Sequence, residues 1–238
     1  MAVVGGPNLV ADGLVLYLDA SNAESYPGSG STWYDLSGND NHFTLYNSPT
    51  YSSGKFTFDG VNEFAQCNNT TCGNFGLVGA TVEYGVNIAL PAVSYASITM
   101  KRGAITSIGS PSNPGWAHRT TVSFFAHDNN PGGSRDPVAE VSSVDTYSSI
   151  AHHCMTLSRS GLNYVMNFYT NNISKGSKSS AFVGDGNISN SVAMTIFYTP
   201  GENTYLSGDF YFIRLYNRQL SDAEVAQNYS ATRSRFGL

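Results

Sequence analysis

Residues 207–238, SGDFYFIRLYNRQLSDAEVAQNYSATRSRFGL, decide the fold, because they join an apolar strand to a well-marked helix. Within them, residues 210–216 contain no Gly, Pro or Asp, and aromatic or branched side chains fill most positions. The alternation of a strand predicts Ile213 and Leu215 on one face and Phe210 on the other. A strand that is apolar on both faces is typical of the middle of a sheet. The earlier part of the chain must therefore supply its partner strands.

The residues after this strand mark the start of a helix. Ser221 can accept a hydrogen bond from the amide of Glu224, whose carboxylate can reach back to the amide of Ser221. This arrangement is a capping box, and Leu220 and Val225 occupy the positions of a hydrophobic staple around it. A narrow apolar stripe continues from Val225, which predicts that the helix lies against the body of the protein.

The composition is that of an all-β protein with many turns. The 238 residues include 24 Gly, 15 Tyr and 13 Phe, and only 12% are charged. A helical protein would need more Leu, Ala, Glu and Lys. Composition is uniform along the chain, and single β sandwiches reach this size. We therefore expect an arm at residues 1–12 and a single domain over residues 13–238.

Charge and hydropathy exclude several kinds of partner. The net charge is -5 and the 12 Lys and Arg residues do not cluster, so we expect no nucleic-acid binding. No apolar run is long enough to span a bilayer, and we expect no membrane insertion. Residues 1–13, MAVVGGPNLVADG, lack the basic start and apolar core of a secretory signal.

Further strands are predicted at a spacing typical of a β sandwich. The alternating or branched apolar runs lie at residues 13–20, 42–46, 55–59, 81–90, 94–100, 120–126, 152–158, 163–169 and 192–198. Turn-rich loops are predicted between the later strands, at residues 103–115, 128–137, 171–180 and 184–190.

Three blocks of the sequence resemble the concanavalin A-like, laminin-G-like jelly-roll domains found in structural proteins of tailed bacteriophages. The blocks are residues 13–51, residues 55–64 (KFTFDGVNEF) and residues 212–238. The resemblance implies an all-β jelly-roll β sandwich with one short C-terminal helix. It also implies that the first strand, with Leu14 and Leu18, lies beside the last long strand.

Paired carboxylates, which glycoside hydrolysis normally needs, are absent from the strand pattern. The run Glu-x-Asp-x-Glu of hydrolases with this fold does not occur, and no nucleophile-elbow motif is present. Glu83 is the only carboxylate well inside a strong strand, and we interpret it as a solvated or paired residue. We therefore expect no catalytic residues and a protein that is not an enzyme.

Metal or cofactor binding is not expected either. Asp59, Asn62 and Glu63 occupy a segment where relatives often show Asp-Gly-x-Asn-Asp, but calcium needs six or more oxygen ligands. We favour a tight turn in which Asp59 accepts hydrogen bonds from its own backbone amides. His152 and His153 are adjacent on a strand and point to opposite faces, so they cannot easily hold one ion.

The three cysteines do not indicate a disulfide scaffold, because their number is odd. Cys67 and Cys72 bracket four polar residues, and either a small disulfide loop or two free thiols fits this spacing. Cys154 lies in an apolar run, which is typical of a small core residue.

Carbohydrate recognition needs exposed aromatic faces with amide or acid groups beside them. Trp116, in SPSNPGWAHR, is the best candidate for glycan binding, because the neighbouring Pro and Gly suggest a loop tip. The alternative is that its ring packs down as an anchor. Trp33 is a poorer candidate because it belongs to the fold's own pattern.

These features lead to the hypothesis of a non-enzymatic phage virion structural protein, most simply a decoration or cement protein on the capsid. Its expected partners are capsid or other virion proteins, with the protein forming a homo-oligomer on the particle, and its expected location is the virion. Residues 1–12, 103–115 and 128–137 are the segments best able to reach a neighbour. The alternative is a glycan-binding adhesin or lectin module of a tail fibre, with a host surface glycan as its partner.

Overall fold

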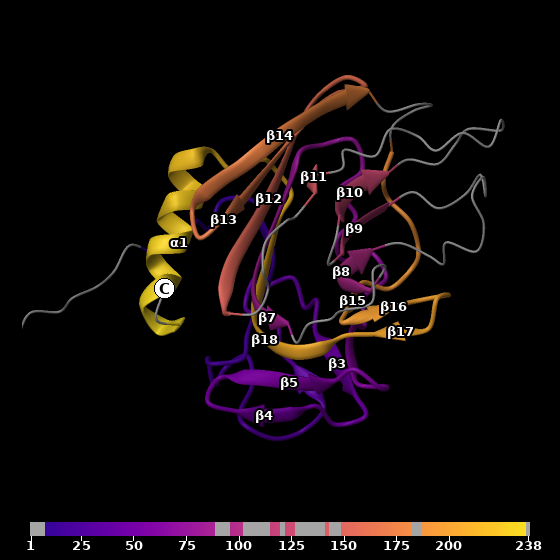
Figure 1. Ribbon diagram of the computed structural model, residues 1–238, viewed down its shortest axis with the longest axis vertical. Coiled ribbons are helices and arrows are strands. Elements are labelled where there is room, and N and C mark those ends of the chain that lie inside the picture. Colours follow the sequence, from indigo (N-terminus) through magenta and orange to yellow (C-terminus); the bar gives the residue numbers. More distant parts are fainter. Residues whose placement is uncertain are drawn as a thin grey trace, which may run out of the picture.

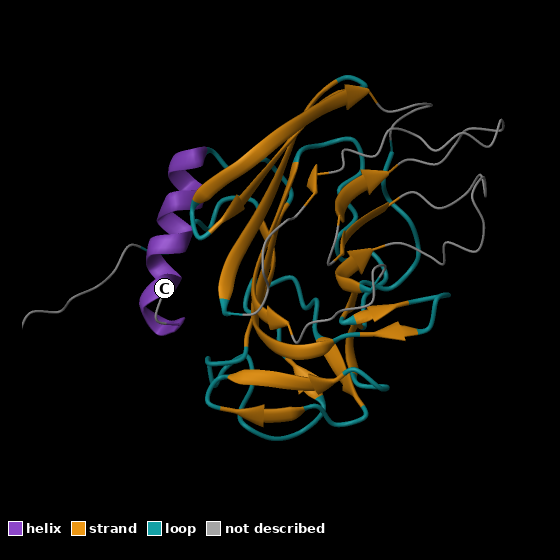
Figure 2. Cartoon of the chain, in the orientation of Figure 1, coloured by secondary structure: helices purple, strands orange, loops and turns teal. Residues whose placement is uncertain are grey.

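Two layers of β-sheet form the body of the protein. The computed structural model describes residues 8–88, 96–101, 115–119, 122–126, 141–142, 149–181 and 187–236. Within them, two eight-stranded sheets pack face to face, and a helix lies on the outer face of one sheet (Figure 1). Strands account for most of the regular structure, as the colours of Figure 2 show. The prediction of an all-β jelly-roll sandwich with a short C-terminal helix is confirmed.

We call the two layers sheet A and sheet B. Sheet A consists of β1 (Leu14–Asp19), β4 (Thr50–Ser52), β5 (Lys55–Asp59), β7 (Ala80–Ile88), β12 (Ala151–Ser160), β13 (Asn163–Thr170), β14 (Ile173–Ala181) and β18 (Ser207–Tyr216). Sheet B consists of β2 (Thr32–Trp33), β3 (Phe43–Tyr46), β6 (Phe64–Cys67), β8 (Ser97–Lys101), β9 (Gly115–Arg119), β10 (Val122–Ala126), β11 (Val141–Ser142) and β15 (Thr195–Ile196). A separate hairpin joins β16 (Tyr198–Thr199) to β17 (Thr204–Tyr205), and the helix is α1 (Asp222–Phe236).

β18 is the central strand of sheet A. Its first half pairs with β5 and its second half with β1 along one edge, while β7 pairs along the other edge. The neighbour that the resemblance implied for this strand is therefore confirmed. A register shift between Phe210 and Phe212 is a β-bulge, which places one extra residue in β18. Phe210 consequently faces the core with Ile213 and Leu215, and its predicted place on the opposite face is wrong.

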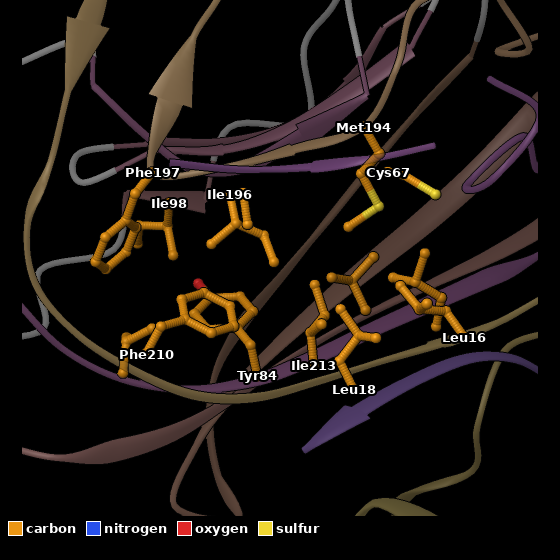
Figure 3. Packing of buried hydrophobic residues seen from close by; sticks show 14 of the residues in the cluster. Leu16, Leu18, Cys67, Tyr84, Ile98, Met194, Ile196, Phe197, Phe210 and Ile213 are labelled. Atoms are coloured by element: carbon orange, nitrogen blue, oxygen red, sulfur yellow. The ribbon is translucent and has the colours of Figure 1, made fainter. Parts of the chain in front are cut away.

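The hydrophobic core lies between the sheets. Figure 3 shows Ile98, Ile196 and Phe197 pointing from the sheet B layer toward sheet A. Tyr84 of β7 and Phe210 of β18 meet them from the other side, and none of the five side chains has exposed surface. Burial of one large apolar side chain is worth about 1.5–3 kcal/mol, so this layer holds the sheets together.

Some predicted boundaries are wrong. The loop predicted at residues 171–180 is β14, an edge strand whose sequence, ISKGSKSSA, has little strand propensity and which forms by pairing with β13. The strand predicted at residues 192–198 is split at Phe197 into β15 and β16. The loop predicted at residues 128–137 lies outside the described residues, as do residues 102–114 and residues 1–7 of the expected arm.

The start of α1 is built as predicted. The Ser221 amide donates to Glu224 Oε2 at 2.8 Å, and the Glu224 amide donates to Ser221 Oγ at 3.4 Å. Leu220 and Val225 are both buried, so the hydrophobic staple is also confirmed. The guanidinium of Arg218, at 2.6 Å from Glu224 Oε1, together with the Ser221 amide, lowers the pKa of Glu224 to about 2. Within the described residues, no helix is long and apolar enough to cross a membrane.

Replacement of the cap residue Ser221 tests how much this helix start contributes to the stability of the fold. Ser221→Ala removes one cap bond and should lower the free energy of unfolding by about 1 kcal/mol while the fold is retained. For a domain of this size, the thermal midpoint should fall by about 2–4 °C. Ser230→Ala, at an exposed position inside α1, is the matched control and should not lower the midpoint. An equal midpoint for wild type and Ser221→Ala would contradict the cap.

Candidate functional site

Trp116 does not lie at a loop tip. It is the second residue of β9, its side chain is fully buried, and its indole nitrogen donates to the carbonyl oxygen of Gly73 at 2.9 Å. Its ring packs on Phe75, with 5.8 Å between the ring centroids. The sequence signal misleads because the preceding Pro and Gly mark the start of a strand. Trp116 is therefore a buried anchor, as the alternative interpretation of the sequence held. It exposes no ring face that a sugar could contact.

The Asp59 segment is the predicted tight turn. Asp59 Oδ1 accepts hydrogen bonds from the amides of Val61, Asn62 and Glu63 at 2.8, 3.3 and 3.4 Å. The Glu63 carboxylate in turn accepts the Asp59 amide at 2.8 Å. These backbone bonds, led by that of Val61, lower the pKa of Asp59. In the described part of the chain, no group of three or more His, Cys, Asp or Glu could hold a metal ion.

Glu83 is a paired residue, which is one of the two states expected for it. Its Oε2 lies 3.2 Å from Arg214 Nε and accepts a hydrogen bond from Asn228 of α1 at 2.9 Å. His152 Nε2 lies 3.7 Å from the other carboxylate oxygen. Burial raises the pKa of Glu83, and the charge of Arg214 opposes that shift. All of these side chains lie under α1 and away from solvent, so the cluster attaches the helix.

The thiols of Cys67 and Cys72 lie together, and both are free and buried. A hydrogen bond between them lowers the pKa of Cys67 and raises that of Cys72. Of the two alternatives that the sequence left open, the structure therefore shows the free thiols.

A group of aromatic side chains gathers on the outer surface of sheet B. We call it the aromatic patch, and it consists of Tyr46, Phe64, Tyr198 and Tyr205. Tyr46 and Phe64 are opposite each other on β3 and β6, and their rings stack in parallel with centroids 4.5 Å apart. The Phe64 ring also lies 4.7 Å from Tyr198, which stacks on Tyr205 at 4.9 Å. The patch is thus a continuous row of rings drawn from four strands.

Tyr46 stands at the open end of this row. It is 38% exposed, whereas the other three rings are half-buried. Because Phe64 covers one face of the Tyr46 ring, the exposed surface lies on its opposite face and at its hydroxyl edge. Burial and the neighbouring Tyr205 raise the pKa of Tyr198, so the hydroxyl of Tyr198 stays neutral.

Polar side chains stand directly beside the rings. Thr44 and Gln66 form the next outward-facing pair on β3 and β6, two residues from Tyr46 and Phe64, and both are half-buried. Thr44 donates from its hydroxyl to Asn68 Oδ1 at 2.7 Å. An aromatic face bordered by a hydroxyl and two amides is the combination that carbohydrate recognition requires.

A residue with a strained backbone conformation orients the β16–β17 hairpin toward this patch. Phe197, between β15 and β16, has φ of 58°, a left-handed conformation that is unusual for a bulky residue. Its ring packs against Phe58 at 5.1 Å and against Phe210 at 5.4 Å. The burial of this ring offsets the backbone strain, which is on the order of 1–3 kcal/mol. The reversal of the chain there turns Tyr198 outward onto Phe64.

Sequence reasoning missed this patch because its members are scattered over residues 46–205. In the sequence, each of them taken alone is a typical aromatic residue of a β-strand. One usable signal was present: alternation in β3 places Phe43 and Leu45 inward, which leaves Tyr46 outward. The partner of Tyr46 depends on strand pairing, which the pattern of a single strand does not contain.

Comparison with known proteins identifies the fold of the chain but does not assign the chain to a family. No family model and no curated protein matches the chain. A Trypanosoma rangeli sialidase in complex with sialic acid has a TM-score of 0.62 and 16% identity, over 94% of this chain and 33% of the sialidase. The same sialidase in complex with 2,3-difluoro-KDN has a TM-score of 0.64 and 15% identity, over 98% of this chain and 37% of that one. The chain thus spans about a third of these sialidases.

A second group of similar structures comes from bacterial toxins. The receptor-binding domain of botulinum neurotoxin D has a TM-score of 0.63 and 12% identity, over 92% of this chain and 52% of that one. That of the C/D mosaic serotype has a TM-score of 0.60 and 12% identity. The fold is shared with both groups. These matches support the β-sandwich part of the resemblance, and the phage part stays a prediction.

The sialidase matches correct the expectation that the protein is not an enzyme, since the same fold occurs in chains of glycosidases. The expectation rested on the absence of paired carboxylates in one strand. A catalytic pair is defined by distance in space, and separate strands can supply it. Sialidases also use a tyrosine nucleophile, so the carboxylate criterion does not apply to them.

Two buried histidines predict how stability depends on pH. Burial holds the pKa of His118 and His152 well below the usual value of 6.5, so both rings are neutral in the folded protein. The unfolded chain binds a proton at each near pH 6.5, and stability should therefore be lost as pH falls through that value. The slope is about 1.4 kcal/mol per pH unit for each histidine.

Denaturant midpoints measured between pH 8 and pH 5.5 test this linkage. His118→Gln keeps an amide opposite the Tyr84 hydroxyl, with which His118 Nδ1 forms a hydrogen bond, and should remove about half of the slope. Equal stability of the wild-type protein at both ends of this range would show that the two rings are not buried in the neutral form.

Proposed function

We propose that this domain is a glycan-recognition module that binds carbohydrate at the aromatic patch. The observation that carries the proposal is the exposed ring of Tyr46, stacked on Phe64 and bordered by Thr44 and Gln66. The apolar C–H face of a sugar ring packs on an aromatic face, while hydroxyl and amide groups beside the ring bind the sugar hydroxyls. Recognition sites in general combine apolar or aromatic walls with a few fixed polar groups.

The patch is preorganised for such binding. Phe64 holds the Tyr46 ring from one side, and the Tyr205 hydroxyl donates to Asn203 at 3.1 Å within its own hairpin. The loops beside Tyr46 are joined, since the side-chain amide of Asn47 donates to the carbonyl oxygen of Asn62 at 2.6 Å. Side chains that are already fixed lose little conformational entropy when a ligand binds.

The structural comparisons also support a role in recognition. The matched toxin domains are named for receptor binding. The low identity means that these names describe those proteins, and the patch residues carry the argument for this chain. The alternative of a glycan-binding adhesin module, with a host surface glycan as partner, is the part of the sequence hypothesis that agrees with the patch.

Capsid decoration, with capsid or other virion proteins as partners, stays a prediction from the sequence resemblance. The segments expected to reach a neighbour on the particle lie mostly outside the described residues. Location in the virion is compatible with glycan recognition, because an adhesin on a particle binds the surface of its host.

Substitution of the exposed ring tests the proposed function. Tyr46→Ala removes the open aromatic face and should weaken binding to glycans on an array, and in solution calorimetry, by about tenfold, because one aromatic contact is worth about 0.5–1.5 kcal/mol beyond its buried area. The fold should be kept, since Tyr46 lies on the surface.

Tyr34→Ala is the matched control for this experiment. Tyr34 is 42% exposed, is followed by the turn before β3, and contacts the ring of His42 at the opposite end of that strand. Its loss should leave glycan binding unchanged. Binding that survives in Tyr46→Ala at wild-type strength would rule out the patch as the binding surface.

A further inference from the structure

Basic residues are missing from the segments that build the aromatic patch. Residues 1–100 contain a single Lys or Arg, Lys55, and residues 179–213 contain none. All four patch residues, together with Thr44 and Gln66, belong to these two segments. Any positive charge at the patch must therefore come from Lys55 or from another part of the chain.

Two described cations, Lys55 of sheet A and Arg119 of sheet B, are paired with carboxylates. Lys55 Nζ lies 2.6 Å from Asp209, and that contact raises the pKa of Lys55. Arg119 of β9 lies 3.3 Å from Glu202, which belongs to the turn between β16 and β17, and Arg119 is only 5% exposed. Each of these two cations is already neutralised by a carboxylate partner.

Acidic residues instead stand next to the patch residues in the chain. Glu63 directly precedes Phe64, and Glu202 lies between Tyr198 and Tyr205 in the hairpin. The Cα atoms of Glu63 and Phe64 are about 3.8 Å apart, so Glu63 is attached to the chain within the roughly 8 Å over which charges interact at physiological salt. The turn fixes this carboxylate, because it accepts the amide of Asp59 at 2.8 Å.

We infer that the ligand of the aromatic patch is a neutral glycan and that the patch rejects glycans carrying sialic acid, uronic acid or sulfate. This inference rests on the proposed function and names its ligand class. Carboxylates and sulfates are recognised by cationic forks, above all by Arg, and like charges brought together oppose binding. The hydroxyl of Thr44 and the amides of Gln66 and Asn68, which strand pairing and a hydrogen bond place beside the Tyr46 and Phe64 rings, match sugar hydroxyls and N-acetyl groups.

Matched glycans with and without an acidic group provide the test. The wild-type protein is applied to an array holding lactose with 3′-sialyllactose, and N-acetylglucosamine and galactose oligomers with their sulfated forms. Within each pair that is bound, the neutral member should bind at least tenfold more tightly than the acidic member. The difference should shrink when salt is raised from 50 to 300 mM, because the repulsion is screened.

Glu63→Gln separates charge from shape. The amide oxygen of Gln can still accept the Asp59 amide, so the turn is kept while the charge is removed. Affinity for the acidic members should rise several-fold, and affinity for the neutral members should stay within twofold. Asp40→Asn, at a carboxylate that is 91% exposed in the turn before β3, is the matched control and should change neither class.

The outcomes distinguish the two proposals. Tighter binding of the acidic members, lost in Tyr46→Ala, would overturn the neutral-ligand inference and leave the glycan-recognition function standing. Binding of no glycan by the wild type, or binding that is insensitive to Tyr46→Ala, would remove the proposed function and this inference with it. Equal binding of both members of each pair would also overturn the neutral-ligand inference.

Discussion

The ion pair of Glu83 and Arg214 constrains the outer face of sheet A. The two residues lie opposite each other on β7 and β18, and neither has exposed surface. Loss of one member of a buried pair leaves an uncompensated charge, at a typical cost of about 3–5 kcal/mol. Neighbouring side chains must therefore surround the buried ion pair. The guanidinium lies 4.5 Å over the ring of Phe212, and Asn228 of α1 supplies a hydrogen bond to the carboxylate. The helix is thus an integral part of the sandwich.

The opposite face of the protein depends on the core in a similar way. Phe197 can hold its left-handed conformation because its ring is enclosed by Phe58 and Phe210, which belong to sheet A. The geometry of the aromatic patch on the outside of sheet B is therefore fixed through side chains of the other sheet. Preorganised recognition surfaces commonly draw on the stability of the scaffold beneath them.

The sequence was sufficient for elements that are specified locally. The capping box at Ser221 and the turn at Asp59 each involve residues within four positions, and both formed as predicted. The face of Phe210 was mispredicted because the bulge in β18 arises from pairing with β7. β14 and the aromatic patch were missed for a related reason, since strand pairing brings together residues that are distant in sequence. Trp116 was misplaced because Pro and Gly can precede a strand as well as mark a loop.

The position of β18 in the chain has a consequence for how this domain acquires its structure. β7 ends at Ile88 and β18 begins at Ser207, yet the two strands are neighbours in sheet A. During synthesis, β1, β5 and β7 must wait for their common partner until it has left the ribosome. Closure of such a long loop has an entropic cost, and this cost arises before the contacts between the two strands can offset it. Sheets with such non-local pairings fold in milliseconds to seconds. The edges of β1 and β7 that pair with β18 stay open in that interval, which is therefore the stage of folding most open to aggregation.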